Sequence, residues 1–167
     1  VLKNIKRSNI SLTALVGGAK ESNAKEMLRS YGEVILALPG DSFEAHTQSI
    51  KELIDDGIAR IMCNYLVLLP GTDMESASSR QEFDYSTRYR VIPGAHGVYR
   101  WGSQEIQSFE SIEMVVSNNT MSFADYLRCI EFDLVVECFY NNRFFAEFLG
   151  LLAFLGLPVS SYLDEVF

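Results

Sequence analysis

The sequence predicts an α/β fold with a parallel sheet, followed by a largely helical C-terminal extension. Three observations predict it: a mostly apolar run over residues 33–38, a longer one over residues 58–69, and one amphipathic stretch between them. Continuous apolar runs are typical of parallel strands, which are covered on both faces. The order strand, helix, strand is the arrangement that lets two neighbouring strands run parallel.

The amphipathic stretch predicts a helix from Ser42 to Asp56. Its apolar positions recur at helical spacing; they are Phe43, His46, Ile50, Leu53 and Ile54. We expect Asp41 to be the N-cap, with Glu44 completing a capping box three residues later. Gly57 is expected to end the helix, because glycine readily adopts the left-handed conformation that follows a helix.

Each predicted strand ends in the same loop motif, Leu-Pro-Gly. Proline cannot donate to a strand ladder, and glycine lets the backbone turn and approach a ligand closely. In α/β folds, ligands bind at the carboxyl ends of parallel strands. We therefore expect a cofactor-binding site built from both loops: Leu38, Pro39, Gly40 and Asp41 from the first, and Leu69, Pro70 and Gly71 from the second. The alternative is that both Pro-Gly pairs serve only as turns.

The second half of the chain predicts an extension over residues 73–167, distinct from a first unit over residues 1–72. Its polar start predicts a surface loop up to residue 88. Short strands are expected over residues 89–93 and 98–101, and the pattern over residues 105–117 fits a strand or a helix. Ser122 and Asp125 form a capping box for one helix, and a second helix is expected from Phe144 to Leu157.

Composition narrows the class of protein. The net charge of −8 and a pI near 4.7 argue against nucleic acid as a partner, because phosphate binding needs clustered Lys and Arg. The longest apolar stretch, Phe144 to Leu157, is too short to span a bilayer, so no membrane association is expected. Three cysteines without a disulfide pattern favour a reducing, cytoplasmic location. Because no initiator Met is present, we expect the chain to be a fragment of a longer protein.

Five segments resemble a known family. They are VLKNIKR (1–7), ILALPGD (35–41), LLPGT (68–72), RYRVIP (88–93) and NTMSFADYL (119–127). The first three resemble the second half of the radical S-adenosylmethionine barrel. The last two are similar to the C-terminal region of the cobalamin-binding branch of that superfamily.

This resemblance implies a partial (β/α) barrel over residues 1–72 and a parent enzyme that uses S-adenosylmethionine, a [4Fe–4S] cluster and cobalamin, acting on a small-molecule substrate as a methyltransferase-like protein. In that family a C-x-x-x-C-x-x-C motif holds the cluster, and the cofactor carries the chemistry. The chain has no such motif: Cys63, Cys129 and Cys138 are widely spaced. We therefore expect structural thiols, no metal site in this chain and no catalysis by the chain alone.

Other candidate residues carry weaker signals. His46, on the apolar side of its helix, is expected to be a satisfied, half-buried histidine. His96 has no metal-binding partner nearby, and Glu110 and Glu113 fit a shared helix face only if residues 105–117 are helical. Two functions remain: part of a radical S-adenosylmethionine enzyme, or a freestanding α/β domain that binds a small ligand or a partner.

A truncated barrel would leave apolar strands and an apolar helix uncovered. Monomeric soluble proteins seldom expose large apolar patches. We therefore expect the chain to form a symmetric homodimer that pairs exposed strand edges or buries the helix from Phe144 to Leu157.

Overall fold

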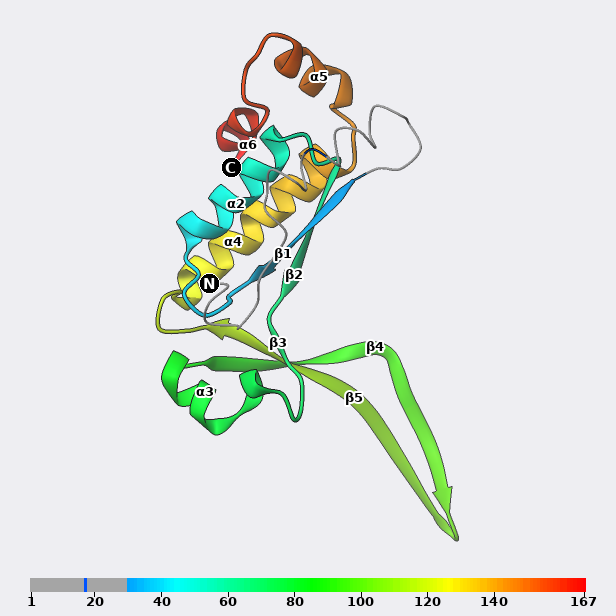
Figure 1. Cartoon of the computed structure of the whole chain (residues 1–167). Coiled ribbons are helices and arrows are strands. Elements are labelled where there is room, and N and C mark those ends of the chain that lie inside the picture. Colours follow the sequence, from blue (N-terminus) through cyan, green and yellow to red (C-terminus); the bar gives the residue numbers. More distant parts are fainter. Residues whose placement is uncertain (1–16, 18–29) are drawn as a thin grey trace.

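The computed structural model describes Gly17 and residues 30–167. Helices and strands are mixed, with a parallel strand–helix–strand unit in the middle and a long antiparallel hairpin that projects from one end (Figure 1). The elements are β1 (Tyr31–Leu36), α2 (Phe43–Asp55), β2 (Arg60–Tyr65), β3 (Val67–Leu68), η1 (Asp73–Glu75), α3 (Ala77–Phe83), β4 (Ser86–Trp101), β5 (Gln104–Ser117), α4 (Phe123–Val136), η2 (Glu137–Asn141), α5 (Ala146–Phe154) and α6 (Ser160–Val166). The first segment of the family resemblance, residues 1–7, lies outside the described residues.

The parallel pair predicted by the sequence is present. β1 and β2 run parallel in register from Tyr31 opposite Arg60 to Leu36 opposite Tyr65. β1 ends two residues earlier than expected, because Ala37 adopts a left-handed φ of 68° and turns the chain out of the strand. Within the described residues the parallel sheet has two strands and no closed barrel forms.

The second predicted strand is divided between two sheets. The N–H of Leu66 donates to the carbonyl oxygen of Leu36 in β1, while its own carbonyl oxygen accepts from Val115 in β5. Leu66 therefore joins the parallel sheet to an antiparallel one with the order β3–β5–β4. The expectation of one continuous strand from Ile58 to Leu69 was wrong, because an apolar run carries no sign of a change of sheet.

The helix between the strands ends as predicted, but it begins with a different N-cap residue. Ser42, not Asp41, is the N-cap of α2, and its hydroxyl oxygen accepts from the N–H of Ala45 at 3.2 Å. At the other end, Gly57 has a φ of 85°, and its N–H donates to Ile54. The N–H of Ile58 donates to Leu53, which completes a Schellman motif.

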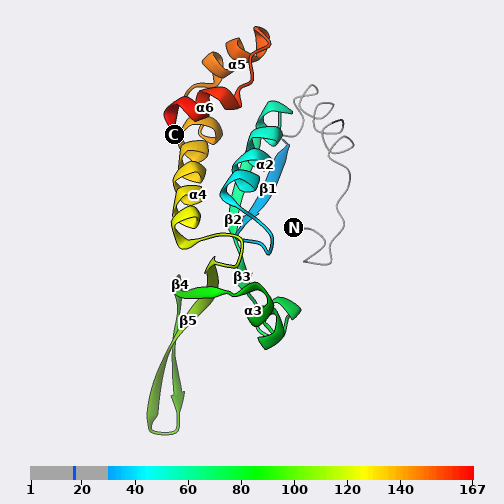
Figure 2. The same ribbon diagram turned by 90° about the vertical axis from the view of Figure 1, so that its left-hand side faces the viewer.

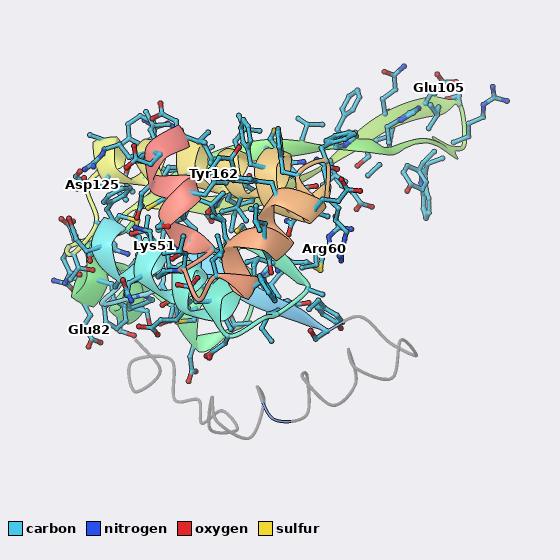
Figure 3. The ribbon with its side chains drawn as sticks, turned by 90° about the horizontal axis from the view of Figure 1, so that it is seen from above. Lys51, Arg60, Glu82, Glu105, Asp125 and Tyr162 are labelled. Carbon is cyan, nitrogen blue, oxygen red and sulfur yellow. The ribbon has the colours of Figure 1, made fainter. Side chains whose placement is uncertain are left out.

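The extension differs most from the sequence prediction. The expected surface loop contains η1 and α3. The two expected short strands are both parts of β4, which forms one long hairpin with β5, with a bulge between Val91 and His96. The hairpin extends beyond the rest of the molecule, with Glu105 near its tip (Figure 3). Residues 105–117, whose pattern fits a strand or a helix, form a strand, as part of β5.

Two of the C-terminal helices, α4 and α6, pack on the parallel unit. Ser122 caps α4 as predicted, since its hydroxyl oxygen accepts from the N–H of Asp125 at 3.1 Å. α4 packs beside α2 and continues into the π-helical η2 (Figures 1 and 2). There the Asn141 side chain bonds both backbone groups of Ile61 in β2, and so fills part of that strand's edge.

The predicted second C-terminal helix is the shorter α5, and α6 was not expected. None of the described helices is long and apolar enough to cross a bilayer.

Candidate functional site

The two Pro-Gly loops have the same local geometry. The N–H of Asp41 donates to the carbonyl oxygen of Leu38 at 2.9 Å, and the N–H of Thr72 donates to Leu69 at 3.2 Å. The glycines in the third position, Gly40 and Gly71, have φ values of 84° and 82°. Proline in the second position and a positive φ in the third match a type II turn. The sequence motif therefore encodes one turn twice.

Their positions in the fold differ. The turn Leu38–Asp41 follows β1, at the carboxyl end of the parallel sheet, where ligands bind in α/β folds. The turn Leu69–Thr72 follows β3, which pairs antiparallel with β5 in the other sheet. The expectation that both loops lie at one edge of one parallel sheet was therefore wrong. Its cause is the change of sheet at Leu66.

A buried asparagine holds the first turn. The side-chain amide of Asn118 donates to the carbonyl oxygens of Ala37 at 3.0 Å and Leu38 at 3.4 Å. Its own carbonyl oxygen accepts from the backbone N–H groups of Thr120 and Met121. A left-handed backbone conformation costs free energy for residues other than glycine and asparagine. Ala37 therefore needs such support. Asn118 thereby joins the turn after β1 to the segment that begins α4.

Behind the turn lies a buried histidine between two carboxylates. His46 Nε2 is 2.8 Å from Asp133 Oδ1 in α4, and His46 Nδ1 is 3.9 Å from Asp41 Oδ2, which is too long for a hydrogen bond. The His46 side chain is fully buried, not half-buried as expected, and among the described residues its Nδ1 has no hydrogen-bond partner. The expectation of a satisfied histidine was therefore half right.

Asp41 is also buried, and its Oδ1 accepts from the N–H of Ser42 at 3.0 Å. Burial raises the pKa of this carboxyl above its ordinary value, while the neighbouring His46 opposes the rise. The inward direction of the carboxylate explains why it does not cap α2. A histidine facing carboxylates can exchange protons, but this one has no exposed surface through which a substrate could reach it. The cluster therefore fastens α2 and α4 together beneath the turn.

The exposed part of the turn is its backbone. Gly40 is exposed, whereas Pro39 and Asp41 are buried. Because Gly40 carries no side chain, a flat ligand can lie directly against the peptide groups at the end of β1. Asn118 and the His46 cluster lie beneath this exposed backbone and support it.

The cysteines do not form a ligand set. All three are free; Cys63 and Cys129 belong to or pack against the buried clusters, and Cys138 is exposed. Burial, and after it the nearby Asp133, raises the pKa of the Cys129 thiol to about 12 and also raises that of Cys63. Among the described residues no cluster of His, Cys, Asp or Glu is arranged to hold a metal ion.

The remaining candidates have other roles. Glu110 and Glu113 lie in β5, not on a helix. Arg80 binds Glu113 with two nitrogens, at 2.8 and 2.7 Å, and Thr87 donates to the same carboxylate. Hydrogen bonds from Arg80 lower the pKa of Glu113 to about 2. This pair joins α3 to the base of the hairpin, and His96 lies at the hairpin bulge.

Sequence reasoning missed the two most informative side chains, Asn118 and Asp133. Asn118 stands beside a segment that the family resemblance includes, and this was the one available signal. Asp133 is an acidic residue in a helix, a position that usually faces solvent.

A comparison with protein-family models found no matching family, and a comparison with curated proteins found no match either.

Proposed function

We propose that the chain is part of a radical S-adenosylmethionine enzyme of the cobalamin-using branch. In this proposal the turn Leu38–Asp41 contributes its backbone to the site for the adenosine part of S-adenosylmethionine. The parallel unit of β1, α2 and β2 is then a segment of a partial (β/α) barrel. The substrate of the parent enzyme is a small molecule, and this chain alone is not catalytic.

The observation that carries the proposal is the contact of Asn118 with the end of β1. The segments 35–41 and 119–127 resemble the family independently and lie far apart in the sequence. In the structure they are neighbours, because the amide of Asn118, next to the second segment, bonds the carbonyl oxygens of Ala37 and Leu38. Two segments that share one function are expected to meet at one site, and these meet at a ligand-binding position of α/β folds.

The iron–sulfur cluster belongs elsewhere in this proposal. Cluster binding needs several thiolates that converge on one site. Cys129 lies in one buried cluster, Cys63 packs against the other, and Cys138 is exposed. When bound, the cluster and S-adenosylmethionine supply the radical or methyl-transfer chemistry. This chain supplies the shape of the turn, the support of Asn118, and an open backbone at Gly40.

The binding role is tested by titrating the chain with S-adenosylhomocysteine and following backbone amide resonances. We expect millimolar ligand to shift the resonances of Leu38 to Ser42. Gly40→Ala strains a residue with a φ of 84° and should weaken binding at least tenfold. Gly71→Ala is the matched control, because Gly71 occupies the same turn position with a φ of 82°. Equal loss of binding in both variants, or no shift in the wild-type protein, contradicts the proposal.

The second candidate is a freestanding α/β domain that binds a different small ligand at the same turn. Two buried apolar clusters among the described residues favour it: one contains Leu36, Val115 and Met121, and the other contains Ile50, Ile61 and Phe132. The gene sequence upstream of Val1 separates the candidates. A C-x-x-x-C-x-x-C motif there supports the enzyme, and a start codon immediately before Val1 supports the domain.

A further inference from the structure

One ring nitrogen of His46 is hydrogen-bonded and the other is not. Nε2 lies 2.8 Å from Oδ1 of Asp133 in α4, and because a carboxylate only accepts, Nε2 carries the hydrogen. Nδ1 faces Oδ2 of Asp41 at 3.9 Å, and among the described residues it has no hydrogen-bond partner. The imidazole is fully buried. A buried polar atom without a partner costs free energy, so the gap between Nδ1 and Asp41 needs an explanation.

A single proton shared by the two side chains explains this gap. A protonated Asp41 donates to Nδ1, and a protonated His46 donates to Asp41, so both forms are the same pair with one proton. Without that proton, two acceptors face each other and the buried carboxylate is charged, which is the costly state. Burial raises the pKa of the Asp41 carboxyl, against the opposing effects of His46 and of backbone hydrogen bonds at Ser42 and Ala37.

The other titratable groups near the pair keep their charge state or have partners elsewhere. Asp133 faces the pair from α4 and accepts from Nε2. Burial raises the pKa of the neutral groups near Asp133, so they stay neutral; they are Cys63 of β2 and Tyr126 and Cys129 of α4. The charged groups on the elements around α2 are placed differently: Lys51 pairs with Asp164 of α6, Arg128 of α4 lies over the Phe43 ring, and Glu33 of β1 is exposed.

A second position for the Asp41 carboxylate exists at the start of α2. Ser42 is the present N-cap, but Asp41 comes directly before it, and aspartate is as good an N-cap as serine. An N-cap at Asp41 would accept from the N–H of Glu44, whereas the present cap accepts from the N–H of Ala45. The helix dipole also favours a negative charge at this end. An ionised Asp41 therefore has better partners outside than inside.

We propose that Asp41 has two positions, which are selected by the proton that it shares with His46. With the proton, the side chain points inward to Nδ1 and Ser42 caps α2, as in the structure. Without it, the carboxylate turns outward and becomes the N-cap, so that α2 begins one residue earlier. The Asp41 side chain is 8% exposed and that of His46 is fully buried, so the proton leaves to solvent through Asp41.

The change of position alters the turn that carries Gly40. The N–H of Asp41 donates to the carbonyl oxygen of Leu38 and closes this turn. Rotation of the Asp41 backbone into the N-cap conformation therefore also moves the exposed peptide groups beside it. The turn has one form at low pH and another at high pH. This inference goes beyond the proposed function, because it concerns the turn itself and holds with any ligand or none.

The test is a nuclear magnetic resonance titration of the full chain from pH 4 to pH 9. It follows the carboxyl carbon of Asp41, the ring nitrogens of His46, and the amide protons of Glu44 and Ala45. We expect one common midpoint for Asp41 and for Nδ1 of His46. At that midpoint the Glu44 amide proton should move downfield as it gains a hydrogen bond. The Ala45 amide proton should move upfield as it loses its bond to Ser42.

Two variants make the test specific. Asp41→Asn should keep the inward position at every pH, because its amide donates to Nδ1 permanently. It also retains the titration of the Glu44 carboxyl, and so supplies the reference for the amide shifts of that residue. Ser42→Ala removes the cap of the inward position only. Its midpoint should therefore be lower than that of the wild type by about half a pH unit or more.

Several results would overturn the proposal. Separate midpoints for Asp41 and His46, or no titration of Asp41 in this range, would show that they share no such proton. A titration of Asp41 without the opposite shifts of Glu44 and Ala45 would show that the cap does not change. An unchanged midpoint in Ser42→Ala would show the same, as would the full amide step in Asp41→Asn. The wild-type chain alone decides the first two results, so they do not depend on the folding of any variant.

Discussion

The side-chain amide of Asn118 donates to the carbonyl oxygen of Ala37 at 3.0 Å, across a sequence separation of 81 residues. Ala37 has a left-handed φ of 68° at the end of β1, and this bond helps to hold it there. The same asparagine accepts bonds from the segment that leads into α4. One side chain thus fixes the geometry of the turn and links it to a distant part of the chain.

Asn118→Ala should lower the free energy of unfolding by about 1–3 kcal/mol, because it removes the side-chain partner of the Ala37 carbonyl oxygen and of the Thr120 N–H. Chemical denaturation measures this loss. Asn119→Ala is the matched control: its side chain makes one exposed bond to Glu82, so its loss should cost less than about 0.5 kcal/mol. Equal losses in the two variants would mean that Asn118 has no special supporting role.

Ser42→Ala should destabilise the protein by about 1 kcal/mol, through loss of the N-cap of α2. Ser49→Ala in the same helix is the control, because the Ser49 hydroxyl only donates back to the carbonyl oxygen of Ala45, an interaction that adds little to a helix. Thermal melting of both variants makes the comparison. A larger effect at Ser49 would contradict the assignment of the cap.

The raised pKa of Asp41 predicts a pH dependence of defined sign. The folded protein holds the Asp41 proton more tightly than the unfolded chain does, so protonation of this group favours the fold. Its contribution is complete below the ordinary aspartate pKa of about 4 and is lost as the pH rises through the raised value. The variant Asp41→Asn has no carboxyl group at this position, so its stability does not show this decrease with rising pH.

Denaturation curves of wild type and Asp41→Asn, compared from pH 3 to pH 8, measure the effect. The stability of the wild type relative to the variant should fall as the pH rises. Asp84→Asn, at an exposed position, controls for the removal of one negative charge. A difference that grows with pH would show that the environment of Asp41 favours its charged form.

Anaerobic reconstitution with iron and sulfide should give no iron–sulfur absorption and no cleavage of S-adenosylmethionine. The reason is that the three thiols do not converge: Cys129 lies in one buried cluster, Cys63 packs against the other, and Cys138 is exposed. Absorption spectra and iron analysis measure the outcome. Near-stoichiometric iron and sulfide that disappear when the three cysteines are replaced would contradict this part of the account.

The features that the sequence predicted well are those set by neighbouring residues. Gly57 ends α2 because it adopts the left-handed conformation that glycine tolerates, and Ser122 begins α4 because its side chain bonds a nearby N–H. The Pro-Gly motifs also act locally, since proline and glycine fix the dihedral angles of the turn themselves. The strand–helix–strand order followed from the periodicity of the apolar residues.

The features that the sequence did not predict depend on distant partners. Leu66 joins two sheets through bonds to Leu36 and Val115, and nothing in an apolar run marks such a junction. Asp133 is partly buried against His46, which comes from another helix, and the sequence of α4 alone does not indicate this contact. The residue type of Asp41 suits a helix cap, but its carboxylate turns inward toward the same histidine.

The central claim is that the turn Leu38–Asp41 contacts the adenosine part of S-adenosylmethionine. Intermolecular nuclear Overhauser effects between S-adenosylhomocysteine and the isotopically labelled chain test it most directly. We predict effects from the adenine and ribose protons to Leu38 and Gly40, and none to the matched turn at Leu69–Thr72. Effects confined to that second turn or to residues remote from β1, or no effects at saturating ligand, would contradict the claim.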